Sequence, residues 1–447
     1  MTEKVRQEQV AQLALDQAKK LGCEDVSVVC AFSNENQVRF ANNSITLVNN
    51  VRDITLDVYL SLSKKRIIGS SYNPTEKGII RFIESLAKSC RALPESKDYV
   101  SLPQGPFSYS PHHANYDSEV EDASFVEYAK EAMSSALSSG ANRASGSINS
   151  EVTNLFILTS GGATSSDRVS QILLNIRAFA DDNSSGHGLS CSSYLSDFHP
   201  SEAGSRAGIY AKRALNSALI SEGEYKVIFT PTVIANILPI ASSASAFAIE
   251  SGNSILSERL GQKVAVDKLN VEDRGVFEHG LGGRIFDDEG LPTRTNRIIN
   301  AGVFETMLHN STTAKKFGKG SSTGNAGIIA PRSTTVVFSA GDSSLEEIVK
   351  ETGEGLLITN NWYTRYQNIR TGDYSTVPRD AAFRIRNGEV KEPVSGFRLS
   401  DSVPRQLSNI ELISREREWI KWWEVSTPTL APTMMIKGVR VTRAVGS

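Results

Sequence analysis

The chain has 447 residues, and its 48 lysine and arginine residues nearly balance its 50 aspartate and glutamate residues, which leaves a formal net charge of −2. Proteins that bind the phosphate backbone of nucleic acids usually carry a basic surplus, so we expect no direct contact with nucleic acid. With 39% hydrophobic and 22% charged residues, the composition is that of a folded globular protein. At roughly 100–200 residues per domain, the length predicts two or three domains.

The cysteine content and the hydropathy of the sequence indicate the cellular compartment in which the protein is expected. Its four cysteines, Cys23, Cys30, Cys90 and Cys191, are too few for a disulfide framework, and reduced thiols are typical of cytoplasmic proteins. The amino-terminal segment is charged and lacks the apolar core of a signal peptide. No apolar run of the sequence approaches the ~18 residues that a membrane helix needs. We therefore expect a soluble, cytoplasmic protein that makes no membrane contact.

The N-terminal part predicts a helix, an antiparallel meander and a second helix. Apolar residues recur at helical spacing from Val10 to Leu21. Residues of the next stretch alternate between polar and apolar, which is typical of half-buried strands. The predicted strands are 26–32, 37–42, 44–50, 53–62 and 66–72. Asn73 and Pro74 then predict the start of a helix, because Asn is a favoured N-cap and Pro fits the first turn.

A long connection separates this unit from a second region of strands. Residues 92–121 contain several prolines and few apolar residues, which predicts a loop rather than an element. The elements predicted after it are a helix at 123–137, alternating runs at 152–159 and 177–180, a strand near 188–194 and a helix at 201–218.

A short polar break at 221–224 predicts a boundary between two domains, 1–220 and 221–447. Beyond it the sequence predicts a strand at 225–230, helices at 231–248 and 344–353, and many short strands between glycine, proline and asparagine turns. The predicted fold class is α+β. It combines an N-terminal helix and an antiparallel meander region with a β-rich, barrel-like or sandwich C-terminal domain that carries inserted helices.

The sequence offers no clear catalytic motif. None of the histidines stands at the i, i+4 spacing of a helical metal site, and no G-x-S-x-G segment is present. The glycines at 280–283 lack the lysine of a phosphate-binding loop. We therefore predict neither a catalytic nor a metal-binding residue. The six histidines are His112, His113, His187, His199, His279 and His309.

Three polar, glycine-containing segments are candidates for a catalytic or a binding site. They are 286–293, which holds Asp287, Asp288 and Glu289, then 321–327 and 371–375. Neighbouring carboxylates can bind a cation or act as acid and base, and they also form ordinary solvated turns. Small residues let another backbone approach, so these segments suit a cleft in which an extended peptide pairs with a sheet edge. Ordinary β-turns fit them equally well.

Several segments occur in a characteristic order along the chain. Those of the C-terminal half are 257–261, 286–293, 298–303, 313–314, 322–326, 345–348, 355–358, 371–375 and 386–389. In this order they resemble the TldD/PmbA family, whose members are also called modulators of DNA gyrase. The N-terminal helix and residues 38–43 look like the opening of the family, and together the similar segments cover most of the chain.

The resemblance implies a cytoplasmic, zinc-dependent peptidase built from a TldD-type and a PmbA-type (TldE) subunit. In the TldD type a helix carries H-E-x-x-x-H, and a late cysteine adds a further zinc ligand. Residues 234–243 of this chain contain neither histidine nor glutamate, and no cysteine follows Cys191. Without imidazole or thiolate ligands nothing holds Zn²⁺. The chain is therefore similar to the PmbA type, and we expect zinc in a TldD-type partner and no cofactor here.

As a PmbA-type subunit, the chain is expected to complete the cleft for peptides or unfolded proteins beside a TldD-type catalytic subunit or a second copy of itself. Two alternatives remain open: a peptide-binding homodimer without enzymatic activity, and a self-sufficient hydrolase that uses the 287–289 carboxylates or His279 with a cation. Trp419, Trp422 and Trp423 form either an exposed protein contact or part of the core. The candidate cleft residues are Asp287, Glu289, Thr323, Asn325, Asp373 and Ser375.

Overall fold

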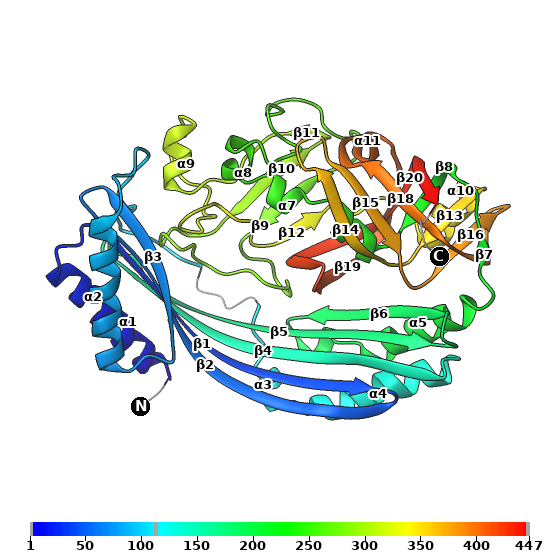
Figure 1. Ribbon diagram of the computed structural model, residues 1–447, viewed down its shortest axis with the longest axis horizontal. Helices are drawn as coiled ribbons and strands as arrows, with labels where there is room; N and C mark the ends of the chain where they lie inside the picture. Colours follow the sequence, from blue (N-terminus) through cyan, green and yellow to red (C-terminus); the bar gives the residue numbers. More distant parts are fainter. Residues whose placement is uncertain (1–2, 111–114, 444–447) are drawn as a thin grey trace.

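A computed structural model describes residues 3–110 and 115–443. A long, curved N-terminal sheet lies beneath a strand-rich C-terminal half (Figure 1). The strands of the N-terminal sheet are β1 (Val26–Ala41), β2 (Ser44–Leu62), β3 (Lys65–Tyr72), β4 (Arg143–Thr159), β5 (Thr164–Phe179) and β6 (Ser185–Ser192). They are antiparallel in the order β3-β2-β1-β4-β5-β6, so β3 and β6 form the two edges.

Helices cover the convex face of this sheet at both ends (Figure 1). At one end α1 and α2 bury their apolar residues against Val28, Leu56 and Val58, which share one face of β1 and β2. At the other end α4 and α5 pack on residues of β4 and β5. The helices are α1 (Glu3–Lys20), α2 (Glu76–Ala92), α3 (Glu119–Asp122), α4 (Phe125–Ser138), the 3-10 turn η1 (Leu195–Asp197) and α5 (Pro200–Arg213).

Glycines allow α5 to lie unusually close to its neighbours. A Cβ atom at Gly188 of β6 would come within 2.0 Å of the carbonyl oxygen of Ala203 in α5. Where α5 meets α4, a Cβ atom at Gly204 would come within 2.1 Å of the carbonyl oxygen of Ala132 in α4. Any side chain at either position would push the helix away from the sheet or from α4.

The C-terminal half is a 14-stranded mixed sheet with inserted helices. Its strands are β7 (Ala218–Leu219), β8 (Gly223–Phe229), β9 (Val271–Arg274), β10 (Thr295–Asn300), β11 (Val303–Phe304), β12 (Val336–Phe338), β13 (Gly355–Ile358), β14 (Asn361–Asn368), β15 (Asp373–Pro378), β16 (Ala382–Arg386), β17 (Glu389–Ser395), β18 (Phe397–Ser402), β19 (Ile410–Trp422) and β20 (Val425–Arg443). Its helices are α6 (Pro231–Ile237), α7 (Ile240–Ser243), α8 (Ala246–Glu250), α9 (Ser311–Lys316), α10 (Leu345–Thr352) and α11 (Val403–Ser408).

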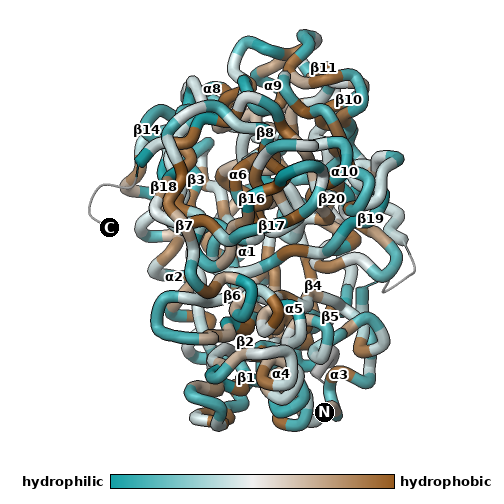
Figure 2. Tube along the Cα trace, turned by 90° about the vertical axis from the view of Figure 1, so that its right-hand side faces the viewer, coloured by the Kyte–Doolittle hydropathy of each residue, from teal (hydrophilic) through white to brown (hydrophobic). Residues whose placement is uncertain are grey.

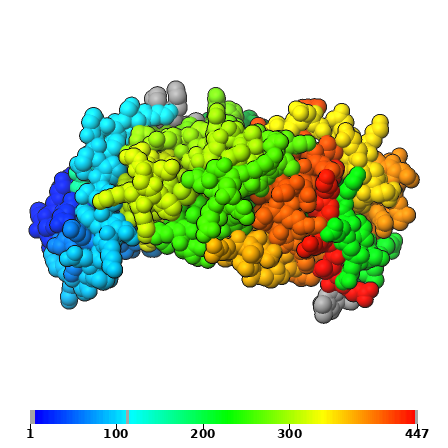
Figure 3. Space-filling model, turned by 90° about the horizontal axis from the view of Figure 1, so that it is seen from above, coloured from blue at the N-terminus to red at the C-terminus, as the bar shows by residue number. Residues whose placement is uncertain are grey.

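The long strand β20 organises this half because it pairs with β8, β12, β18 and β19. Apolar, brown stretches run through the interior of both halves, whereas the turns at the periphery are mostly teal (Figure 2). Seen from above, the blue N-terminal segments lie at one end of the molecule and the C-terminal half, coloured green to red, occupies most of the visible face (Figure 3). The predicted α+β class, with its strand-rich C-terminal half, is confirmed. The domain boundary at 220 stays a prediction.

Several predicted elements differ in extent from the observed ones. The segments 26–32 and 37–42 belong to the single strand β1, and 44–50 and 53–62 belong to β2. The tight turn between β1 and β2 is made by Asn42 and Asn43, which have φ values of 50° and 65°. The run at 177–180 falls at the end of β5 rather than in a strand of its own. Period-two patterns located these strands but did not reveal how far they continue.

Two predicted helices also need correction. Helix α2 begins after Thr75, whose side chain accepts a hydrogen bond from the backbone of Gly78, so Asn73 is not its N-cap. The helix predicted at 231–248 is wrong as a single element, because it divides into α6, α7 and α8. Pro239 lies at the first break, where it supplies no N–H and its ring excludes a continuous helix.

No described helix of the chain is long and apolar enough to span a membrane.

Candidate functional site

Asp287 lies at the centre of a buried turn in the C-terminal half. Its side chain is 1% exposed. One carboxylate oxygen accepts backbone N–H groups of Glu289 (3.0 Å) and Leu291 (2.9 Å), and the other accepts the N–H of Ala326 (2.9 Å). Burial raises the pKa of Asp287 to about 6, although these hydrogen bonds favour the ionised form. The carboxylate therefore closes its own turn and ties it to the loop that contains residue 326.

Glu289 ties the same turn to α9. Its carboxylate accepts the backbone N–H of Ser311 at 3.0 Å and the hydroxyl of Ser311 at 2.6 Å. Burial raises the pKa of Glu289 to about 7, and the neighbouring charge of Asp287 acts in the same direction. Between them sits Asp288, which pairs with Arg284 at 2.7 Å. The three consecutive carboxylates thus have three different sets of partners.

Asn325 and Thr323 lie in the loop that Asp287 holds. The Asn325 amide donates to Asp273 at 2.6 Å, and its oxygen accepts from the amide of Asn296 at 2.8 Å. The Thr323 hydroxyl accepts the backbone N–H of His309 at 2.7 Å. Asp273 is fully buried, and burial raises its pKa. We call Asp273, Asp287 and Glu289 the carboxylate cluster.

The structure brings four of the six candidate cleft residues together around this cluster. A cavity of about 240 Å³ adjoins it and is lined by Asp287, Asn325, Arg284 and Arg332, among others. Asp287 and Asn325 nevertheless already have backbone or side-chain partners for most of their polar atoms. Their shared arrangement supports the loops, and whether any of them touches a peptide stays a prediction.

Asp373 and Ser375 lie elsewhere, on β15. Asp373 is exposed and accepts a hydrogen bond from Thr371 at 2.5 Å. Ser375 is buried and accepts from the guanidinium of Arg398 at 2.9 Å. Strand β15 pairs with β14 and β18, and the hydrogen-bond partners of both residues lie outside the carboxylate cluster. These two residues therefore belong to a separate part of the C-terminal sheet.

The segment that the resemblance aligns with a zinc-binding helix is apolar. Val233, Ile234 and Ile237 of α6 are fully buried and belong to the main core of the C-terminal half. The amide of Asn236 donates to the backbone oxygen of Asn361 at 3.2 Å. Over residues 3–110 and 115–443, no three His, Cys, Asp or Glu side chains are placed to hold a metal ion. The donor atoms of this segment do not fit zinc.

His279 has a setting that the sequence did not reveal. Its Nδ1 lies 2.8 Å from a carboxylate oxygen of Asp197, and its ring stacks on Tyr194 with 4.1 Å between the centroids. These residues come from η1 and a loop 82 positions later, so no local motif could predict the pair. Both His279 and Asp197 line a cavity of about 420 Å³ next to β6. His112 and His113 lie outside the described residues.

The tryptophans of β19 and its turn divide between core and surface. Trp422 is 7% exposed and packs with Leu189 and Cys191 of β6, whereas Trp423 is 56% exposed. Trp419 is partly buried and contacts the ring of Phe277. Trp422 therefore belongs to the core, and a protein contact at the exposed Trp423 stays a prediction.

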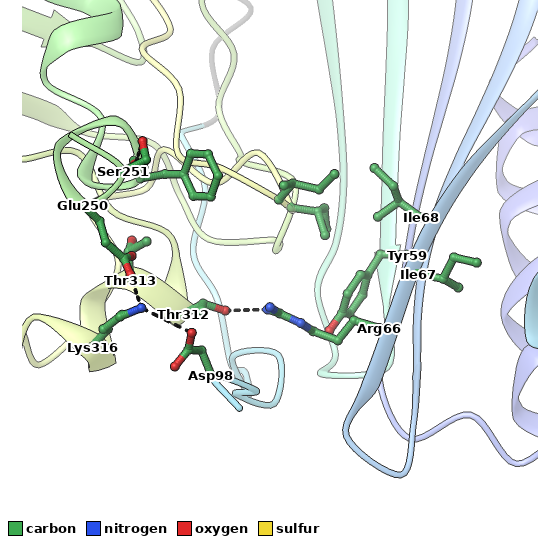
Figure 4. A pocket seen from close by; sticks show the side chains of 13 residues that line it. Tyr59, Arg66, Ile67, Ile68, Asp98, Glu250, Ser251, Thr312, Thr313 and Lys316 are labelled. Carbon is green, nitrogen blue, oxygen red and sulfur yellow. Dashed lines mark hydrogen bonds and ion pairs between the residues drawn. The ribbon is translucent and has the colours of Figure 1, made fainter. Parts of the chain in front are cut away.

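A groove runs between the N-terminal sheet and the C-terminal half. It consists of two adjoining cavities of about 630 Å³ and about 410 Å³, which share Tyr59, Ile68, Ile328 and Ile329. Figure 4 shows Tyr59, Arg66 and Ile68 on the β2–β3 wall, opposite α9 and residues 250–251. Sequence alone could not predict this groove, because its walls are brought together only by the packing of the two halves.

Comparisons with known proteins agree with this architecture. The family model of the PmbA/TldA metallopeptidase C-terminal domain matches residues 222–443, and that of the central domain matches 115–222. The metalloprotease PmbA homologue of Haemophilus influenzae is 30% identical over 211 residues, which are 46% of this chain and 44% of that protein. The metalloprotease PmbA of Escherichia coli O157:H7 is 29% identical over 215 residues, covering 46% of this chain and 45% of that protein. The matched region spans about half the length of these curated relatives.

Two solved structures share the fold over nearly the whole chain. A putative modulator of a DNA gyrase from Thermotoga maritima has a TM-score of 0.85 at 23% identity and covers 97% of this chain and 100% of its own. TldE from Thermococcus kodakarensis has a TM-score of 0.86 at 20% identity with the same coverage. With consecutive matches to the central and C-terminal domain models, this chain belongs to the PmbA/TldD family.

Proposed function

We propose that this chain is the non-catalytic, TldE-like subunit of a two-subunit zinc peptidase that degrades or processes unfolded peptides. The observation that carries the proposal is that Val233, Ile234 and Ile237 of helix α6 are fully buried apolar residues in the segment where the family resemblance expects metal ligands. A zinc peptidase needs ligands that hold the metal and activate its water. The zinc and its ligands are therefore assigned to a TldD-type partner, and this chain completes the peptide cleft.

The four cysteines support a cytoplasmic location for this assembly. All four are free and buried, and burial raises the pKa values of the Cys23 and Cys191 thiols to about 11 and about 12. Such thiols stay protonated and unreactive in a reducing compartment. None lies in the C-terminal half, so none supplies a late zinc ligand there.

The test reconstitutes the peptidase from separately purified subunits. This chain, an H-E-x-x-x-H paralogue from the same source, and their mixture are each assayed on a quenched fluorescent peptide, and zinc is measured by elemental analysis. We expect zinc in the paralogue alone and activity that this chain increases. Zinc-dependent cleavage by this chain alone would refute the proposal.

A matched pair of variants separates the proposal from a self-sufficient hydrolase that uses the 287–289 carboxylates. Asp287→Asn keeps one acceptor oxygen for the turn and removes the acid–base group. Asp288→Asn is the control, because Asp288 forms ion pairs with Arg284 and Arg332 instead of closing the turn. If the isolated chain cleaved peptide and only Asp287→Asn abolished this activity, the carboxylate mechanism would replace the proposed one.

A further inference from the structure

The cavity of about 420 Å³ next to β6, which we call the β6 cavity, adjoins the edge of the N-terminal sheet that lies opposite to β3. Its walls come from β6 and α5 of the N-terminal half and from residues 277–279 and β19 of the C-terminal half. It shares no lining residue with the groove beside β3. A cavity of this size falls in the usual range of small-molecule sites, so the charges on its walls indicate which ligand it fits.

Four of the charged side chains that line the β6 cavity already form two pairs. The guanidinium of Arg206 lies 2.6 Å from a carboxylate oxygen of Glu418, and Nδ1 of His279 lies 2.8 Å from Asp197. Each of these groups has its counter-charge within the protein. The ligand preference of the cavity therefore depends on the charged groups that remain.

Arg417 is a cation of this cavity without a counter-ion. Its guanidinium donates to the carbonyl oxygen of Phe338 at 2.9 Å, and no described carboxylate forms an ion pair with it. The neighbouring Arg274 has its own partner, Glu272, at 2.8 Å. Burial and the positive charge of Arg274 both lower the pKa of Arg417. Because a guanidinium stays protonated in proteins, a partly buried positive charge faces the cavity uncompensated.

Two carboxylates of the same cavity also lack a counter-ion. Glu202 and Glu278 line it, and among the described residues neither forms an ion pair, with Arg417 or with any other cation. Glu202 lies in the first turn of α5, where the partial positive charge of the helix end stabilises a carboxylate. Glu278 lies in a loop without this compensation. The cavity thus holds unpaired charges of both signs that do not neutralise one another.

The loop of Glu278 is held against the strand that carries Arg417. Arg417 and Trp419 are two positions apart on a regularly paired part of β19, so their side chains point to the same face of the strand. The ring of Phe277 contacts that of Trp419 edge to face, with 5.7 Å between the centroids. On the other side of Glu278, His279 is fixed by its bond to Asp197. A ligand therefore meets a preorganised wall, which lowers the ordering cost of binding.

We propose that the β6 cavity binds a free α-amino acid with an apolar side chain, whose carboxylate pairs with Arg417 and whose ammonium group pairs with Glu278. A zwitterion compensates both charges at once, whereas a ligand of one charge leaves the other uncompensated. Trp419 and Leu189 line the same cavity and offer apolar surface to the side chain. The inference goes beyond the proposed function and is independent of it, because it assigns a ligand to the isolated chain.

The experiment is isothermal titration calorimetry of the full isolated chain with L-phenylalanine and two analogues. Phenethylamine lacks the carboxylate, and 3-phenylpropionate lacks the ammonium group. We expect phenylalanine to bind at least about tenfold more tightly than either analogue, because each analogue loses one charge-assisted contact. Equal binding of the three compounds, or no binding of phenylalanine up to about 10 mM, would refute the inference.

A variant of Arg417 tests the carboxylate contact. Arg417→Gln should bind phenylalanine about tenfold more weakly and phenethylamine within about twofold of the unaltered chain, since only phenylalanine carries the lost partner. Arg415→Gln is the matched control, because Arg415 lies on the same strand, is 58% exposed and does not line the cavity. Unchanged binding of phenylalanine by Arg417→Gln would overturn the assignment.

The reciprocal variant tests the ammonium contact and keeps the inference falsifiable if Arg417→Gln fails to fold, because Glu278 is exposed. Glu278→Gln should weaken phenylalanine binding by about tenfold and leave 3-phenylpropionate within about twofold. Glu416→Gln, at a 63% exposed position outside the cavity, is its control. A loss of phenylalanine binding in Glu202→Gln but not in Glu278→Gln would contradict the proposed position of the ammonium group. Cleavage by the mixture with the paralogue does not enter these measurements, so their failure would leave the proposed function standing.

Discussion

Different kinds of residues specify the fold of the two halves of the molecule. In the N-terminal sheet, β1 and β2 pair from Val26↔Leu60 to Ala41↔Ser44 with one irregularity, and alternate residues bury against helices. In the C-terminal half, short strands are joined by loops that buried carboxylates hold through backbone N–H groups. Apolar periodicity therefore specifies the first half, whereas individual polar residues specify much of the second. Polar residues in such loops resemble a catalytic site even when they serve the fold.

The largest effect is expected at Asp273, the most buried member of the carboxylate cluster. Its carboxylate accepts from Ser333 (2.6 Å), from the backbone of Thr334 (2.7 Å) and from Asn325 (2.6 Å). Asp273→Ala leaves these donors buried without an acceptor, so the free energy of unfolding should fall by about 4 kcal/mol. Urea denaturation measures this, with Asp273→Asn as the milder control. A loss below about 1 kcal/mol would show that the cluster does not hold the loops.

The second prediction concerns pH and Glu289. Its pKa in the folded protein is raised from 4.5 to about 7, so the folded state retains the proton over that range. The stability that this proton contributes is fully present below pH 4.5 and is lost as the pH rises to about 7. Glu289→Gln does not titrate, so relative to the unaltered chain it should gain roughly 3 kcal/mol between pH 4.5 and pH 8.

The comparison of variant with unaltered chain removes the contributions of other groups. Burial lowers the pKa of His187 to about 4, so this histidine destabilises the fold as the pH falls, which opposes the effect of Glu289. The histidine contributes equally to both proteins and cancels in their difference. Chemical denaturation at the two pH values gives that difference. If the difference in free energy of unfolding between the two proteins were the same at both pH values, Glu289 would titrate as an exposed glutamate does.

The third prediction tests whether the apolar cores of the two halves are equally well packed. Ile83 of α2 and Ile237 of α6 are both fully buried. Replacing either by valine removes one methylene group, which should cost about 1 kcal/mol in each half. Denaturant titration of Ile83→Val and Ile237→Val provides the comparison. A negligible cost at Ile237 alone would mean that α6 is loosely packed and leaves room for a ligand there.

Much of the N-terminal half could be predicted from the sequence because alternation and helical spacing are local signals. The strand positions and the α+β class followed from them, whereas the length of β1 did not. In the C-terminal half, the break at Pro239 was not predicted either. The polar segments at 287–289 and 323–325 were identified, and their mutual contacts could not be, because Asp273 and Asn325 are 52 residues apart. The groove beside β3 is still less predictable, since neither of its walls carries a motif.

The smallest effect is expected at Asp373, which the sequence predicted as a candidate cleft residue and which the structure places on β15, away from the carboxylate cluster. Its carboxylate is exposed and accepts a hydrogen bond from the neighbouring hydroxyl of Thr371. Asp373→Ala should therefore change the free energy of unfolding by less than about 0.5 kcal/mol. A selective loss of cleavage by the reconstituted mixture would instead place β15 at the shared cleft, and the division between a structural cluster and a separate sheet region would have to be redrawn.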